Sequence, residues 1–162
     1  MRDGAGDLLR IYSRARATIP AFLEDYALLA HGLLALHSAA PGAGTAHLDA
    51  AADLMIRAQT LFADQHALTE GGTGSGAFYD SLADQPDLFV RTRTTYDGAM
   101  PSGTSVMINN LVTLAALTGD RAHAQRAARV LAAISPQITQ SPLGAANSVR
   151  ALLRLMAVDR GA

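Results

Sequence analysis

The chain has 162 residues, of which 49% are apolar and 17% charged, with 13 basic side chains, 14 acidic ones and no cysteine. A net charge of −1 provides no basic field for nucleic acid. The lack of cysteine excludes disulfides, thiolate metal ligands and thiol catalysis. The high apolar fraction suggests that further chain or a partner covers part of the surface.

Membrane and export signals are also missing from the sequence. No run of about 18 or more apolar residues occurs, as a membrane-spanning helix requires. Residues 1–7 lack the apolar segment of a signal peptide. We therefore expect a cytoplasmic protein that binds neither membrane nor nucleic acid.

Apolar periodicity and breaks predict five helical segments in an all-α chain. In chain order these segments are expected at residues 21–39, 45–64, 102–118, 120–134 and 143–158. Short β-hairpins are expected before the first and third segments, and their strands are predicted at residues 8–13, 16–19, 77–82 and 88–92. The glycine-rich stretch at residues 71–76 is expected to be a loop, and it lacks the lysine of a phosphate loop.

The helical segments alternate in character. Residues 21–39 and 102–118 are apolar nearly all round, which predicts burial on all sides. Residues 45–64 and 120–134 each have one polar face. The resulting order of inner, outer, inner, outer and inner helices is typical of αα-hairpins stacked in two layers.

An internal repeat supports this reading. A shift of 81 residues maps Leu8-Leu9-Arg10 onto Phe89-Val90-Arg91, and a shift of 76 residues maps Ala46-His47 onto Ala122-His123. We therefore predict a single partial domain over residues 1–162. Its parts are repeat units at residues 7–75 and 76–135 and a last inner helix at residues 141–158.

The polar turn Thr95–Ser105 runs directly into an apolar helix and resembles the start of the first inner helix at Phe22–Tyr26. Because the units repeat, both inner helices should begin on one face, where helix N-termini favour polar or anionic ligand atoms. Asp25 and Asp97 are the candidate catalytic pair, since glycosidases use two carboxylates roughly 5–10 Å apart. The candidate substrate-binding residues are Glu24, Tyr26, Arg91, Tyr96, Ser102, Thr104 and Ser105.

A structural interpretation of the same residues stays open. Ser102 or Thr104 could serve as an N-cap worth about 1 kcal/mol, and Glu24 with Asp25 could complement a helix dipole. Arg91 could equally pair with an acid of the site. The five histidines have no metal-ligand spacing, so neither a metal nor another cofactor is expected.

Three stretches suggest a family: Leu23-Glu24-Asp25-Tyr26-Ala27, Gly32-Leu33-Leu34-Ala35-Leu36, and Tyr96 to Ser105. They resemble the C-terminal part of the thioredoxin-domain-containing proteins, the spermatogenesis-associated protein twenty-like family. In that family Asn stands where this chain has Thr104. The resemblance implies an N-terminal thioredoxin-like domain followed by an (α/α)6 toroid, like those of six-hairpin glycosidases and N-acylglucosamine 2-epimerases. This chain would then be a fragment from the end of the toroid.

Two functional hypotheses follow. In the first, the chain forms part of a carbohydrate-binding or carbohydrate-processing cavity, and a carbohydrate is its ligand. In the second, it is a scaffold without chemistry that docks onto missing repeats, a partner chain or a second copy. A sugar isomerase is a lesser alternative, with His31 as its candidate histidine. Two and a half hairpins do not close a ring, so the first and last inner helices should leave apolar sides bare.

Overall fold

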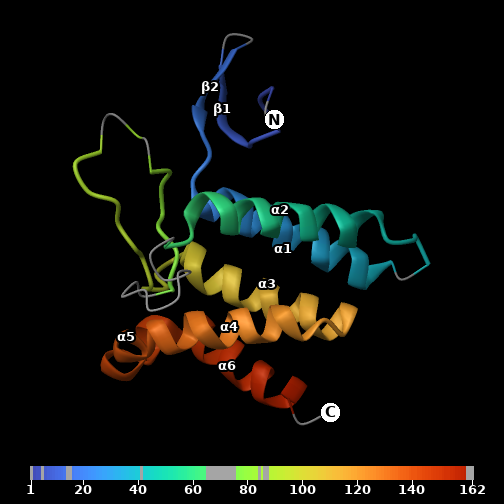
Figure 1. The fold of residues 1–162 in the computed structure, drawn as a ribbon, viewed down its shortest axis with the longest axis vertical. Helices are drawn as coiled ribbons and strands as arrows, with labels where there is room; N and C mark the ends of the chain where they lie inside the picture. The colour runs from blue at the N-terminus through green and yellow to red at the C-terminus, as the bar shows by residue number, and fades with distance from the viewer. Residues whose placement is uncertain are drawn as a thin grey trace.

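The computed structural model describes residues 2–4, 6–13, 16–40, 42–64, 76–83, 85 and 88–159. The described chain is mostly helical, as predicted, with a β-hairpin near its start (Figure 1). Its elements are β1 (Leu9–Ser13), β2 (Arg16–Pro20), α1 (Leu23–Ala39), α2 (Ala46–Phe62), α3 (Gly103–Thr118), α4 (Arg121–Ala133), α5 (Ser135–Gln140), the 3₁₀ turn η2 (Leu143–Ala145) and α6 (Ala146–Asp159). Most of the glycine-rich stretch, the predicted boundary between repeat units and His66 lie outside the described residues.

All five predicted helical segments are present, with ends that differ by a few residues. The sequence did not predict α5, which begins with Pro136 in its first turn, a position where the missing N–H costs nothing. The last predicted helix starts as η2, so α6 itself begins only at Ala146. Ser102 and Asp120 cap α3 and α4 through their side-chain oxygens, which accept N–H bonds from Ser105 and Ala122.

The first predicted hairpin is confirmed, and the second is wrong. β1 and β2 pair antiparallel, from Leu9 opposite Pro20 to Ser13 opposite Arg16. At the second position the described residues form no strand pair, only an isolated bridge between Ala63 and Phe78. One backbone hydrogen bond, from the N–H of Asp80 to the carbonyl of Thr92, joins the two stretches. The carbonyl of Asp80 accepts instead from the N–H of Leu23 in α1, and its carboxylate accepts from the N–H of Thr94.

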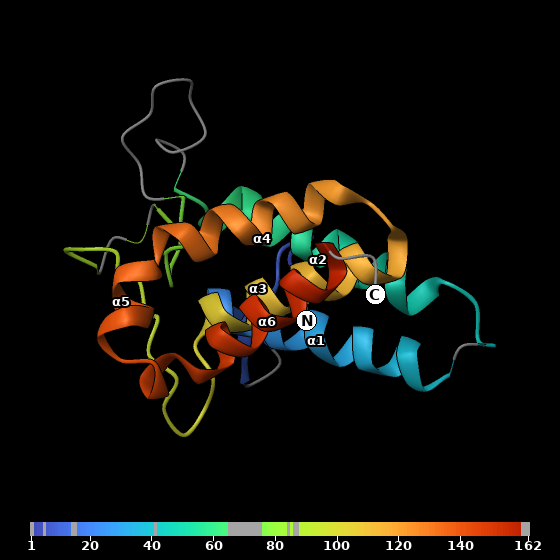
Figure 2. The same cartoon turned by 90° about the horizontal axis from the view of Figure 1, so that it is seen from below.

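Helix α3 occupies the centre of the molecule. It packs against both α1 and α6, while α2 lies against α1 and α4 lies against α3 (Figures 1 and 2). Every residue from Gly103 to Val112 is buried, as the all-round apolar pattern of this helix predicts. The same prediction is wrong for α1, whose Leu29 and Leu36 are 46% and 53% exposed, because no described part of the chain covers that side.

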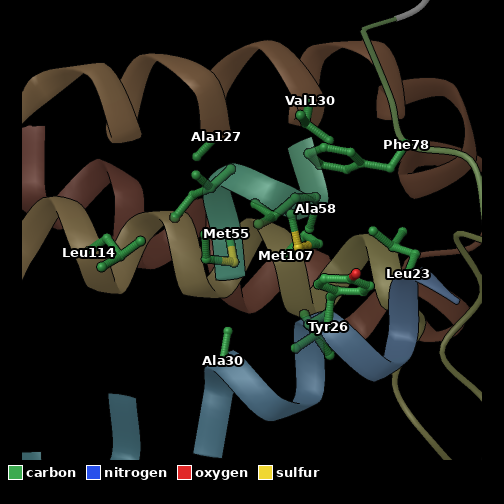
Figure 3. Packing of buried hydrophobic residues seen from close by; sticks show 14 of the residues in the cluster. Leu23, Tyr26, Ala30, Met55, Ala58, Phe78, Met107, Leu114, Ala127 and Val130 are labelled. Atoms are coloured by element: carbon green, nitrogen blue, oxygen red, sulfur yellow. The ribbon is translucent and has the colours of Figure 1, made fainter. Parts of the chain in front are cut away.

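The core lies between α1, α2, α3 and α4 and is closed at one end by Phe78 (Figure 3). Leu23 and Tyr26 enter it from α1, and Met107 enters it from α3 (Figure 3). The ring of Tyr26 meets that of Phe62 edge-on, at 5.6 Å between centroids. Among the described helices, none is both long enough and apolar enough to cross a lipid bilayer.

An ion pair between Asp7 and Arg57 connects the segment before β1 to α2. The Arg57 guanidinium of α2 donates two hydrogen bonds to the Asp7 carboxylate, one of them 2.7 Å long. The buried hydroxyl of Tyr26 donates to Asp7 and accepts the N–H of Leu8 at 2.8 Å. These contacts hold the segment before β1 against both α1 and α2.

This ion pair predicts a stability change in acid. The bonds from Arg57 lower the pKa of Asp7 below its ordinary value of 3.8. A carboxyl whose pKa is lower in the folded state stabilises the fold above its unfolded pKa and loses that contribution as the pH falls through the folded value. We therefore expect Asp7→Asn to be less stable than the wild type at pH 7, with a difference that closes as the pH falls below 3.8. Urea unfolding of both proteins at several pH values and constant ionic strength measures this difference in stability. A difference that does not change with pH would contradict a stabilising role of the Asp7–Arg57 ion pair.

Candidate functional site

The carboxylate of Asp97 joins the starts of α3 and α6. One oxygen accepts hydrogen bonds from the N–H and hydroxyl of Ser102 at 3.0 and 3.3 Å and from the hydroxyl of Ser105 at 2.6 Å. The other accepts from the N–H of Asn147, at the start of α6, at 2.8 Å. Carboxylates are favoured at helix N-termini by the dipole and the unpaired N–H groups. Both oxygens of Asp97 are therefore engaged in fixing α3 to α6.

Two consecutive asparagines of α3 extend this polar network. Asn110 donates to the Ala27 carbonyl of α1 at 2.8 Å, and its amide oxygen lies 3.0 Å from His31 Nδ1. Asn109 donates to the Asn147 carbonyl of α6 at 2.8 Å. Each asparagine thus bonds to a different neighbouring inner helix. Neither asparagine was predicted from the sequence as part of the site, although two adjacent amides inside an apolar helix need buried partners and were a usable signal.

At the start of α1 the acids meet an arginine from β1. Asp25 accepts the N–H of Phe22 at 2.8 Å, which closes the first turn of the helix. Arg10 Nη1 lies 2.8 Å from Glu24 and 3.5 Å from Asp25, and its guanidinium lies over the Phe22 ring. Arg10, which a shift of 81 residues maps onto Arg91, thus forms an ion pair with Glu24.

A cavity of about 350 Å³ opens where α1 and α3 begin. Of the predicted site residues, Glu24, Tyr96 and Ser102 line it. The rest of its wall combines apolar and hydroxyl-bearing side chains with one further acid, and consists of Phe22, Asp80, Ser81, Leu88, Val90, Thr92, Thr94, Met100, Pro101 and Gly103.

Asp80 is the second carboxylate that lines this cavity, beside Glu24. From the sequence it was expected within a strand at residues 77–82, with no functional role. It accepts hydrogen bonds from the hydroxyl of Thr92 at 2.7 Å and from the hydroxyl and N–H of Thr94 at 2.8 and 3.0 Å. An aspartate inside a predicted strand is unfavourable, and that conflict was the available signal.

The other predicted site residues lie away from the cavity wall. Asp25 and Asp97 do not line this cavity, and each carboxylate accepts hydrogen bonds at a helix start. Tyr26, Thr104 and Ser105 are buried in the fold. Arg91 donates to the Ser81 carbonyl and lies over the Tyr79 ring. No cluster of acids and histidines among the described residues could hold a metal ion.

These features define a mostly helical chain with a cavity at the starts of two packed helices, α1 and α3. No family model matches the sequence. Over 131 residues, 81% of its length, the chain is 34% identical to spermatogenesis-associated protein 20 of Rattus norvegicus and 33% identical to that of Homo sapiens. It spans only 16% of the length of each of these relatives. The similarity agrees with the resemblance found in the sequence.

Proposed function

We propose that this chain is part of an (α/α) toroid in a longer, thioredoxin-domain-containing type of polypeptide, and that its cavity forms part of a carbohydrate-binding site. The cavity at the starts of α1 and α3 carries the proposal. The cavity wall combines apolar side chains, the exposed ring of Tyr96 and the hydroxyl groups of serine and threonine residues. This combination suits a polyhydroxylated ligand, which has both apolar faces and hydroxyl groups.

Binding is a better account of this site than bond cleavage. The Asp97 carboxylate accepts N–H groups at the starts of α3 and α6, and the Asp25 carboxylate accepts an N–H group at the start of α1. Neither carboxylate is therefore placed to exchange a proton with a ligand in the cavity. Asp80 is held by Thr92 and Thr94. Glu24 is the acid of the cavity best placed to accept a ligand hydroxyl, because its contact with Arg10 is partly exposed to solvent.

Replacing Glu24 by glutamine tests this proposal. A hydrogen bond to a charged acceptor is worth about 1.5–3 kcal/mol, so we expect about a tenfold or greater loss of affinity for any carbohydrate that binds. Thermal shift and calorimetry against a panel of neutral mono- and oligosaccharides measure the effect. Asp53→Asn, at an exposed position of α2, is the matched control and should bind as the wild type does.

The polypeptide used in this test should be the one the source cells make, identified by its mass in blots or intact mass spectrometry. Binding that Glu24→Gln leaves unchanged would show that the carbohydrate site lies elsewhere. A complete lack of binding across the panel would reject the carbohydrate proposal.

A scaffold without chemistry is the second candidate, and a separate observation favours it. The first and last inner helices leave apolar side chains bare: Leu29 and Leu36 on α1, and Leu152, Leu153 and Met156 on α6. Such faces are usual where further repeats or another chain pack. A stable association through these faces, together with no carbohydrate binding, would favour this role.

A further inference from the structure

Two arginines of α6 converge on one neutral group. Arg150 Nε and Arg154 Nη1 each lie 3.3 Å from the amide oxygen of Asn109 on α3. Arg154 Nη2 also donates to the hydroxyl of Thr113 at 2.9 Å. The arginines are four residues apart and so lie on one face of their helix. Neither contact was foreseen in the sequence, and neither arginine lines the cavity described above.

The charge of this arginine pair is not balanced locally. Among the side chains that the structure describes, no carboxylate lies within ion-pair distance of Arg150 or Arg154. Like charges at this helical spacing repel one another. Burial and the neighbouring charge of Arg150 lower the pKa of Arg154. A bound anion would remove this repulsion.

The geometry also leaves donors for such an anion. A guanidinium has five N–H donors in a planar fork, which matches the oxygens of a phosphate or carboxylate. Only Nε of Arg150 takes part in the bond to Asn109, and the residue is exposed. Asn109 is itself held by bonds from its amide nitrogen to the carbonyls of Ser105 and Asn147, so it provides a fixed support for both guanidinium groups.

We propose that Arg150 and Arg154, supported by Asn109 and Thr113, form a binding site for a small ligand that carries a phosphate or carboxylate group. The two guanidinium groups bind the anionic group, and the amide oxygen and the hydroxyl of α3 hold them in position. This site is separate from the cavity at the helix starts, and it does not depend on the carbohydrate proposal.

Inorganic phosphate and acetate are the probes that test this site, at constant ionic strength. In ¹⁵N NMR spectra of the chain, the Nε–Hε signals of Arg150 and Arg154 should shift and saturate with added probe. Arg150→Gln should weaken binding about tenfold or more, since one charge-assisted contact is lost. Arg154→Lys, which keeps the charge and loses the fork, should weaken it as well.

Arg129→Gln is the matched control, because Arg129 is an exposed arginine on α4. It should leave the affinity for both probes unchanged. Tighter binding of phosphate would identify a phosphorylated ligand, and tighter binding of acetate would identify a carboxylate ligand. Shifts that do not saturate, or an equal loss of affinity in Arg129→Gln, would show general charge screening and overturn the proposal. The amide spectrum of each variant reports whether it remains folded.

Discussion

Replacing Asp97 by alanine is expected to lower the free energy of unfolding by about 3 kcal/mol. The change removes an acceptor that serves the start of α3 through Ser102 and Ser105 and the start of α6 through Asn147. Hydrogen bonds to a charged group are worth about 1.5–3 kcal/mol each, and water replaces part of that loss. For a chain of this size, the melting temperature should fall by about 6–12 °C.

Asp120→Ala is the control for this prediction, because the exposed Asp120 carboxylate caps a single helix through one N–H, that of Ala122. Loss of that N-cap should cost only about 1 kcal/mol. Asp97→Asn should lie between the wild type and Asp97→Ala, because one oxygen can still accept. If Asp97→Ala kept the stability of the wild type while a binding activity was lost, the carboxylate would regain the functional role that the sequence suggested.

Replacing Phe62 by alanine is expected to cost about 3–5 kcal/mol. Phe62 is fully buried at the end of α2, where its ring meets Tyr26 of α1. Removing a buried ring loses its transfer free energy and leaves a cavity that the neighbours only partly fill. Calorimetry should show a melting temperature lower by about 6–20 °C.

Phe89→Ala makes the same chemical change at a fully exposed position. It should alter stability by no more than about 0.5 kcal/mol. The contrast between the two phenylalanine variants measures burial and not the change of residue type. Equal effects at both positions would mean that Phe89 packs against something in solution, such as another chain.

The local sequence pattern was sufficient to locate five helical segments, although it missed the short helix α5. The apolar periodicity and the breaks at Pro41 to Gly44 and at Gly119 set helix positions, because a helix depends mainly on neighbours three and four residues away. Of the two N-cap candidates that the sequence offered for α3, Ser102 and Thr104, the structure selects Ser102. The prediction of the second hairpin was wrong because the carbonyl of Asp80 accepts from Leu23, a residue distant in sequence, and no local pattern reports that contact.

The candidate site divides in the same way. The sequence correctly marked the starts of α1 and α3 as polar, and three of its site residues, Glu24, Tyr96 and Ser102, line the cavity there. It could not say which acid faces that cavity. A carboxylate beside a helix start can either cap the helix or point away from it, and the choice depends on which N–H groups the fold brings near.

The sequence by itself determined the helical class, the positions of five helical segments and the polar character of the two helix starts, since these depend on short-range spacing and residue chemistry. Tertiary structure alone decided that Asp97 joins α3 to α6 and that two arginines meet at Asn109. The contacts that α6 makes with Asp97 and Asn109 link residues about 40 or more positions apart, and only the packing of α6 against α3 brings them within hydrogen-bond distance.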